Sequence, residues 1–411
     1  MAWRFGHTEE AVARQANLRD AAADARERSV ETMARQSDLS GSAVGTPGYS
    51  GVNARANAPV CSVAVAPAAT PECLATAAPT RPSTPLLDVR GFGVAFCEGH
   101  DETFVVDDVD LTVDTGEIVG VVGESGCGKS VMAQSLVRLL EHENRMAYCG
   151  QVLFEGDDLL RRPLSRMREV RGSKIAMIFQ DPLTSLNPVA TVGAQLVETM
   201  RLHGKLSRAE AREQAAELLA RVGIDKPTER LANFPSDLSG GMQQRVMIAI
   251  ALACKPKLLI ADEPTTALDT TTQKQILDLL GELNAQTGMA VMLISHDLEV
   301  VASVCSKIEV MYLGQVVEQA PTSELFARPL HPYTRGLLSS TPPLRGELPS
   351  VLSSIPGGVP SAHGVIAGCR FANRCGTAVE SCVCAPAPQL AEAANGHLVR
   401  CPFAVGEVAL S

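Results

Sequence analysis

The 411-residue sequence predicts an α/β fold built on a parallel β-sheet. Short, continuous apolar runs alternate with helical patterns along much of the chain, and this order produces strands that lie parallel to one another. The run at 117–123 is apolar at successive positions, as expected of a strand that is covered on both faces. A glycine-rich segment and a helical pattern at 129–140 follow it directly.

The remaining elements can be placed in chain order. Two runs rich in Val and Phe, at 86–96 and 104–113, predict strands that precede the parallel set. Residues 191–233 contain no strand pattern and predict a helical insertion. Further parallel strands are expected at 174–179, 257–262 and 290–295, and the clearest further helices at 208–222 and 241–253.

The two ends of the chain differ in composition from its centre. Residues 1–84 are rich in Ala, Arg, Pro, Ser and Thr, so we expect a mostly disordered extension. A docking arm, or a start codon assigned too far upstream, would give the same composition. We expect a folded domain at 85–320, with a helical subdomain at about 181–237, and a C-terminal region at 321–411 that contains a cysteine cluster.

The composition argues against several classes of protein. A formal net charge of -10 and an aromatic content of 4% disfavour nucleic-acid binding through bulk positive charge or base stacking. No apolar run approaches the ~20 residues of a membrane-spanning helix, and the N-terminal residues lack the apolar centre of a secretion signal. The 12 cysteines are therefore expected to be reduced thiols, metal ligands or core residues.

Residues 123–130 match the G-x-x-x-x-G-K-[ST] pattern of a phosphate-binding loop. Its glycines let successive backbone amides face one point, and the N-terminus of the following helix adds to this anion cradle. Lys129 is expected to reach the β- and γ-phosphates of a nucleotide, and Ser130 to bind Mg²⁺. Cys127 should act through its amide, and its place near a helix N-terminus suggests a lowered thiol pKa and sensitivity to thiol reagents. The loop residues are Gly123, Glu124, Ser125, Gly126, Cys127, Gly128, Lys129 and Ser130.

Two carboxylates end the apolar run at 257–262. Asp262 is placed to hold Mg²⁺, and Glu263 is the candidate that polarises the attacking water. An acidic pair at a strand end is by itself no more than a solvated surface feature. Combined with the phosphate loop, the pair predicts nucleotide hydrolysis.

A resemblance to a known family rests on the segment between these two elements. Residues 238–245, LSGGMQQR, resemble the signature motif of the ABC (ATP-binding cassette) ATPases. The resemblance implies a P-loop NTPase (RecA-like) cassette with an antiparallel β subdomain, a helical subdomain and a small cysteine-containing C-terminal extension. It also implies four further family positions, which are the Q-loop Gln180, the D-loop Asp269, the switch histidine His296 and the adenine-stacking Phe96.

The same resemblance implies how ATP is held. Two cassettes pair head to tail, and each ATP lies between one phosphate loop and the partner's signature residues, Ser239, Gly240 and Gly241, at a helix N-terminus. Gln180 would sense Mg²⁺ and the γ-phosphate, and His296 would hold the γ-phosphate and water in line. Hydrolysis would then separate the two cassettes.

The tail narrows the resemblance. Residues 331–338, HPYTRGLL, resemble the C-terminal region of oligopeptide and dipeptide import ATPases, a region that nickel and glutathione importers share. The resemblance implies a peripheral subunit on the cytoplasmic face of the membrane. Its partners would be a second ATPase subunit (more often a different chain than a copy), two permease subunits and, indirectly, an external binding protein. A soluble ABC ATPase of DNA repair or translation and a regulatory protein that uses the cassette as a sensor are the alternatives.

Four cysteines of the tail are candidate metal ligands. Cys369, Cys375, Cys382 and Cys401 can bind a [4Fe–4S] cluster or tetrahedral zinc, and Cys384 competes with Cys382 as the third ligand. Their spacing lacks the paired C-x₂-C of structural zinc sites. The resemblance to importers of this family favours the cluster, with zinc and unligated thiols as alternatives. A metal here would staple the tail, which is too small to hold a core by itself.

Overall fold

A computed structural model describes the chain from Thr84 to Ala404, apart from 99–100, 143–145, 182–184, 205, 267, 341–354, 359, 361–367, 385 and 395. The expected disordered extension at 1–84 lies, except for its last residue, outside the described residues. Within the described part, no helix combines the length and apolar character needed to cross a bilayer.

An eight-stranded sheet forms the centre of the fold, with the strand order β11-β12-β10-β9-β3-β8-β7-β6. Strands β6, β7, β8, β3 and β9 run parallel to one another, which confirms the parallel sheet predicted from the sequence, whereas β10 pairs antiparallel with β9. The strands are β3 (Ile118–Val122), β6 (Ile175–Ile178), β7 (Leu258–Asp262), β8 (Ala290–Ser295), β9 (Lys307–Tyr312), β10 (Gln315–Pro321), β11 (Ala391–Ala394) and β12 (His397–Val399).

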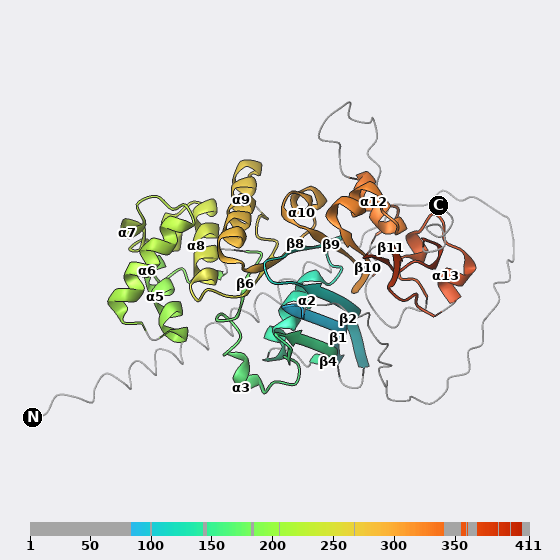
Figure 1. Ribbon diagram of the computed structural model, residues 1–411, viewed down its shortest axis with the longest axis horizontal. Coiled ribbons are helices and arrows are strands. Elements are labelled where there is room, and N and C mark those ends of the chain that lie inside the picture. The colour runs from blue at the N-terminus through green and yellow to red at the C-terminus, as the bar shows by residue number, and fades with distance from the viewer. Residues whose placement is uncertain are drawn as a thin grey trace, which may run out of the picture. The chain divides into compact units, whose positions relative to one another are not determined.

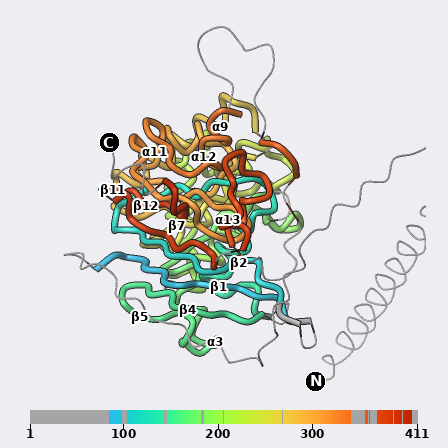
Figure 2. Tube along the Cα trace, turned by 90° about the vertical axis from the view of Figure 1, so that its right-hand side faces the viewer, coloured from blue at the N-terminus to red at the C-terminus, as the bar shows by residue number. Residues whose placement is uncertain are grey.

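A second, antiparallel sheet lies against the first, with the order β2-β1-β4-β5 (Figure 2). It contains the two predicted N-terminal strands, which pair with each other and continue to β4. These strands are β1 (Leu87–Glu98), β2 (Asp101–Val113), β4 (Met146–Phe154) and β5 (Asp157–Asp158).

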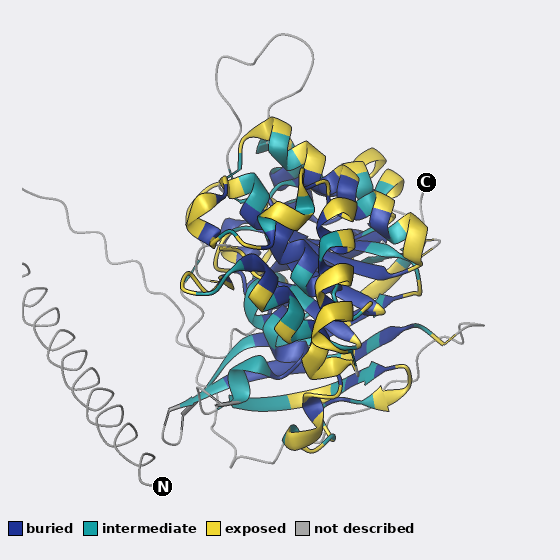
Figure 3. Ribbon diagram, turned by 90° about the vertical axis from the view of Figure 1, so that its left-hand side faces the viewer, coloured by how far each residue is buried: buried dark blue, intermediate teal, exposed yellow. Residues whose placement is uncertain are grey.

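Both faces of the central sheet are covered, and β7 shows how the sequence achieves this. Leu259 and Ala261 belong to the apolar core on the side of the helical insertion, whereas Leu258 and Ile260 belong to the core shared with the antiparallel sheet. Side chains alternate between the faces of a strand, so a strand that is buried on both faces must be apolar at every position. Figure 3 shows the buried strands enclosed by helices whose outer faces are exposed.

The described residues of the predicted helical insertion at 191–233 form the helices α5, α6 and α7 and no strand, which confirms the prediction, and α5 and α6 also contact the following helix α8 (Figure 1). Ser207 begins α6 with a capping box, because its hydroxyl accepts from the Glu210 amide while the Glu210 carboxylate accepts from the Ser207 amide. The helices of the described chain are α2 (Lys129–Leu136), η1 (Leu139–His142), α3 (Leu164–Met167), α5 (Val192–His203), α6 (Arg208–Arg221), α7 (Pro227–Arg230), η2 (Pro235–Asp237), α8 (Gly240–Leu252), α9 (Thr270–Thr287), α10 (Leu298–Val304), α11 (Thr322–Ala327), α12 (Pro332–Ser340), η3 (Ala372–Arg374) and α13 (Glu380–Cys384).

One predicted helix is shorter than expected. The helical pattern at 129–140 divides into α2 and η1, because Arg138 adopts a left-handed backbone conformation with φ 56°. The Arg138 side chain is buried and donates from Nη1 to the carbonyl oxygen of Leu159, a contact 21 positions away. The break between α2 and η1 therefore depends on a contact with a distant part of the backbone, which the helical pattern of the sequence cannot predict.

The C-terminal region adds strands to the central sheet. β12 pairs antiparallel with β10, and β11 pairs with β12. Glu318 of β10 is fully buried, and its carboxylate accepts hydrogen bonds from the amides of Leu330 and His331 and lies 2.7 Å from His397 Nε2. These contacts fasten the residues around the HPYTRGLL segment and the chain's last described strand to the cassette.

Candidate nucleotide-binding site

The phosphate-binding loop connects β3 to α2, as predicted, at the carboxyl end of a central strand. Gly126 and Gly128 adopt positive φ angles of 81° and 101°, which glycine adopts without strain. At Gly123 a Cβ atom would lie 2.2 Å from the Met311 carbonyl oxygen. The loop therefore needs glycine at these three places, for two different reasons.

Lys129 lies inside this loop. Its side chain is 4% exposed, and Nζ donates to the carbonyl oxygens of Gly123 at 2.8 Å and Glu124 at 3.0 Å. The ammonium group is thus held by the loop's own backbone, at the place where the sequence predicts that it meets phosphate oxygens.

The predicted Mg²⁺ ligands Ser130 and Asp262 are in contact. Ser130 Oγ donates to Asp262 Oδ1 at 2.9 Å, although 132 positions separate the two residues. Asp262 is 2% exposed, and burial raises the pKa of its carboxyl group. A buried carboxylate in contact with a half-buried hydroxyl, next to a phosphate loop, suits a small, hard cation such as Mg²⁺, so the donor set fits the predicted ion.

Glu263 lies at the meeting point of three side chains. Its Oε2 accepts from Gln180 Nε2 at 3.0 Å and from Thr266 Oγ1 at 2.9 Å, and lies 3.3 Å from His296 Nδ1. Gln180, Glu263 and His296 follow the adjacent parallel strands β6, β7 and β8, so their carboxyl ends bring the three residues together. Glu263 has φ 47°, a left-handed conformation that turns the chain sharply after β7.

Thr266 was not predicted from the sequence. Thr266 lies three positions after Glu263, and its hydroxyl orients the Glu263 carboxylate by donating a hydrogen bond to it. The only sign of this role in the sequence is that a hydroxyl side chain lies close to a candidate catalytic carboxylate. This sign is weak, because the neighbouring Thr265 also carries a hydroxyl but contacts Gln273 instead.

The signature residues lie at the start of α8. Ser239 is the N-cap of this helix, and its hydroxyl accepts from the Met242 amide at 3.4 Å. At Gly241 a Cβ would lie 2.8 Å from Thr272 Cγ2, so α8 lies close to the start of α9. Figure 1 shows α8 beside α5 and α6, away from α2.

Two further predicted residues occupy defined positions on the scaffold. Asp269 is the N-cap of α9, where its carboxylate accepts from the Thr272 amide and hydroxyl, and these contacts lower its pKa. Phe96 is half-buried on β1, opposite Thr103 of β2 and Met146 of β4. Their roles at a nucleotide stay predictions.

The prediction that the thiol pKa of Cys127 is lowered is wrong. The thiol is 1% exposed, and burial raises its pKa, although Lys129 Nζ at 3.8 Å acts in the opposite direction. Desolvation of the thiolate outweighs the nearby positive charge. Cys127 therefore lacks the lowered pKa of a reactive cysteine.

The four predicted cysteine ligands line one cavity of about 280 Å³ in the tail. Cys369, Cys375, Cys382 and Cys401 are all among its lining residues, and Cys384 is not. Within the described part of the chain, no group of three or more His, Cys, Asp or Glu side chains is arranged to hold a metal ion. The structure thus gathers the predicted residues without forming a compact metal site.

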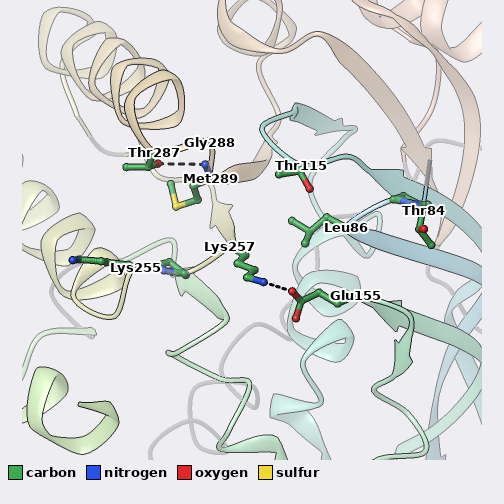
Figure 4. A pocket seen from close by; sticks show the side chains of 11 residues that line it. Thr84, Leu86, Thr115, Glu155, Lys255, Lys257, Thr287, Gly288 and Met289 are labelled. Atoms are coloured by element: carbon green, nitrogen blue, oxygen red, sulfur yellow. Dashed lines mark hydrogen bonds and ion pairs between the residues drawn. The ribbon is translucent and has the colours of Figure 1, made fainter. Parts of the chain in front are cut away.

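A pocket of about 490 Å³ lies elsewhere (Figure 4). Its lining includes Lys257 and Met289, which directly precede β7 and β8, so it lies at the amino ends of these strands. An ion pair between Lys257 and Glu155 borders it. Because the phosphate loop, Glu263 and His296 lie at the opposite ends of the strands, this pocket is not the nucleotide site.

A phosphate loop, a buried magnesium-type aspartate and a glutamate held beside them characterise a P-loop ATPase. Residues 106–266 match the protein family described as ABC transporter, and residues 317–382 match the family described as Oligopeptide/dipeptide transporter, C-terminal region.

Known proteins extend this match over most of the chain. A Sinorhizobium fredii (strain NBRC 101917 / NGR234) protein, named a probable peptide ABC transporter ATP-binding protein, is 52% identical over 316 residues, 77% of this chain and 94% of that protein. A Brucella melitensis biotype 1 protein, provisionally named a peptide import ATP-binding protein, is 46% identical over 77% of this chain and 96% of its own length.

Solved structures agree on the fold. The dimeric ATP-binding cassette MJ0796, in a post-hydrolysis state with ADP and Pi, aligns with a TM-score of 0.52 at 28% identity, over 57% of this chain and 98% of that chain. The protein cbiO1 from Clostridium perfringens, part of the ABC transporter complex cbiONQ, aligns with a TM-score of 0.50 at 29% identity, over 60% of this chain and 92% of that chain. The chain belongs to the ABC transporter family, as one of its ATP-hydrolysing cassettes.

Proposed function

We propose that this chain is the ATPase subunit of a transporter that imports di- and oligopeptides. The contacts of Gln180 and His296 with Glu263, beside the phosphate loop, support the hydrolytic half of the proposal. The match of residues 317–382 to the oligopeptide/dipeptide transporter region, and the names of the two relatives, support peptides as the cargo. Nickel or glutathione import by the same cassette is the alternative.

The hydrolytic roles follow from what each side chain contacts. Lys129 and the loop amides would bind the phosphates, and Ser130, Asp262 and Gln180 would hold Mg²⁺, which offsets negative charge on the phosphates. Glu263 would accept a proton from the attacking water, and His296 would orient that water and the γ-phosphate. Phe96 would stack on the adenine.

The signature helix supports pairing of two cassettes. Ser239, Gly240 and Gly241 form a helix N-terminus suited to a phosphate, on an element grouped with the insertion rather than with the phosphate loop. In the proposed assembly a second ATPase subunit, more often a different chain, offers its corresponding helix terminus and D-loop aspartate to the ATP held here, and this chain offers Ser239, Gly240, Gly241 and Asp269 to the partner's ATP. Two permease subunits, and indirectly an external binding protein, complete a transporter whose ATPase lies on the cytoplasmic face of the membrane.

We retain the proposed division of the chain into an extension at 1–84, a cassette at 85–320 with a helical subdomain at about 181–237, and a C-terminal region at 321–411. The two family matches, which end at 266 and begin at 317, are compatible with it.

Transport by the intact host tests the cargo. A strain without this gene is expected to lose ATP-dependent uptake of a labelled tripeptide, and the wild-type gene is expected to restore it. Uptake of nickel and of glutathione, measured in the same strains, provides the comparison. Loss of nickel or glutathione uptake with peptide uptake unchanged would contradict the proposal.

We further propose that the cavity of the tail holds a [4Fe–4S] cluster. One zinc ion draws four thiolates onto a single centre, whereas each cysteine of a cubane cluster binds a different iron, so more widely spaced thiolates suit the cluster. The lining of one cavity of about 280 Å³ by all four cysteines supports this proposal. By binding all four cysteines, the cluster would stabilise the fold of the C-terminal region.

Analysis of the metal tests this proposal. Full-length protein purified without oxygen is expected to be brown and to contain iron and acid-labile sulfide in equal amounts. Cys375→Ser is expected to lose the colour and most of the iron, because it removes a ligand. Cys384→Ser, outside the cavity, is the matched control and should keep both. Colourless wild-type protein with stoichiometric zinc would refute the cluster.

A further inference from the structure

Three of the four cavity cysteines have an arginine as a direct neighbour in the sequence, and each arginine binds the cassette. Arg370, beside Cys369, binds the Leu313 carbonyl and the Asp107 carboxylate. Arg400, beside Cys401, binds the Asp108 carboxylate and the Val316 carbonyl. The third arginine differs from these two, because its partner belongs to the phosphate loop.

Arg374, beside Cys375, forms a two-pronged ion pair with Glu124 of the phosphate loop. Nη1 lies 2.6 Å from Oε2, and Nη2 lies 3.0 Å from Oε1. The Arg374 side chain is 5% exposed, and it also donates to the carbonyl oxygens of Pro356 and Gly357. A paired guanidinium and carboxylate in this fork geometry fix both position and orientation.

The main chain of the same loop residue is held by the tail as well. The Glu124 amide donates to Tyr333 Oη at 2.9 Å, and Tyr333 belongs to the HPYTRGLL segment. Tyr333 packs at 5.4 Å from the ring of Phe371, which lies between two of the cavity cysteines, and at 4.7 Å from Tyr312 of β9. Glu124 is therefore held from the tail through its side chain and through its backbone.

Charge explains what this contact does for the nucleotide. Glu124 places a carboxylate in a loop that has to attract a polyphosphate, and an unpaired carboxylate there would repel it. It would also compete for Lys129, whose Nζ already lies 3.0 Å from the Glu124 carbonyl oxygen. Arg374 neutralises the carboxylate and holds it in place, so Lys129 and the loop amides remain available to phosphate.

We propose that Arg374 and Tyr333 are positioning residues for the phosphate loop, so that the cysteine-containing tail sets the affinity of this cassette for ATP. The proposal rests on the proposed nucleotide site and is independent of the cargo and of the metal in the tail. It gives the C-terminal region a role in the ATPase reaction, through Glu124.

A rescue experiment tests the pair in the full-length chain. Arg374→Gln is expected to weaken binding of a fluorescent ATP analogue with Mg²⁺ about tenfold, and to raise KM for ATP by a similar factor, with kcat within about twofold of wild type. Adding Glu124→Gln to Arg374→Gln removes the unpaired carboxylate and is expected to restore most of the affinity. Arg374→Lys keeps the charge but not the forked geometry, so its affinity for ATP is expected to lie between those of wild type and Arg374→Gln.

Arg400→Gln is the matched control, since Arg400 is buried, adjoins a cavity cysteine and binds Asp108 instead of the loop. It is expected to lower the melting temperature while ATP affinity stays within about twofold of wild type. A double variant that binds ATP no better than Arg374→Gln would show that Arg374 serves only to fold the tail, and would overturn the proposal. Wild-type protein that fails to bind ATP would overturn the nucleotide site, and the pair with it.

Discussion

Glu263→Gln is expected to lower ATP turnover by about 10²–10⁴-fold, the range that a general base contributes. The amide keeps the size of the side chain and its hydrogen bonds with Gln180 and Thr266, so the site should keep its geometry. What it loses is the ability to take a proton from water. Steady-state release of phosphate from ATP is the measurement, with binding of a fluorescent ATP analogue as the second readout.

The matched control is Glu282→Gln, the same chemical change on an exposed position of α9. It should leave both turnover and ATP binding within about twofold of wild type. Glu263→Gln should bind ATP at least as well as wild type, because one negative charge beside the phosphates is removed. Unchanged turnover in Glu263→Gln would show that another group activates the water.

The sequence could predict this site because each of its parts follows a strand. Continuous apolar runs identify parallel strands, and the carboxyl ends of parallel strands meet at one edge of the sheet. Gln180, Glu263 and His296 each follow such a run, so their contacts through Glu263 Oε2 follow from the sheet. The glycine pattern of the phosphate loop likewise specifies its own backbone conformation at Gly126 and Gly128.

The contacts that could not be predicted from the sequence join segments that are far apart in the chain. Arg374 and Glu124 are 250 positions apart, and neither lies in a periodic pattern. The repeated pairing of an arginine with a cysteine in the tail was visible, but its partners on the cassette were not. Strands β9 and β10 were missed for a related reason, because each contains a buried glutamate, and the groups that satisfy Glu318 come from the tail.

Cys127 shows the limit of reasoning from a motif. Position near a helix N-terminus predicts a lowered thiol pKa, and the charge of Lys129 acts in that direction. Whether the thiol is buried depends on its neighbours in space, since Cys127 packs in the core between the two sheets. Burial reverses the direction of the shift, and the sequence does not record it.

Lys129→Met is expected to weaken ATP binding by at least tenfold and, as a consequence, to abolish turnover at ordinary ATP concentrations. A hydrogen bond to a charged group contributes about 1.5–3 kcal/mol, which corresponds to roughly 10- to 150-fold in affinity. Methionine keeps most of the apolar stem of the side chain, so the buried loop should remain packed. Equilibrium binding of a fluorescent ATP analogue with Mg²⁺ measures the loss.

Lys274→Ala, which removes an exposed lysine from α9, controls for the general loss of positive charge and should bind ATP as wild type does. The contrast with Glu263→Gln separates the two steps of the reaction. If Lys129 binds phosphate and Glu263 activates water, Lys129→Met loses ATP binding and Glu263→Gln loses only turnover. Lys129→Met that binds ATP normally would mean that the ammonium group stays on the Gly123 and Glu124 carbonyls when nucleotide is present, and that the loop amides alone hold the phosphates.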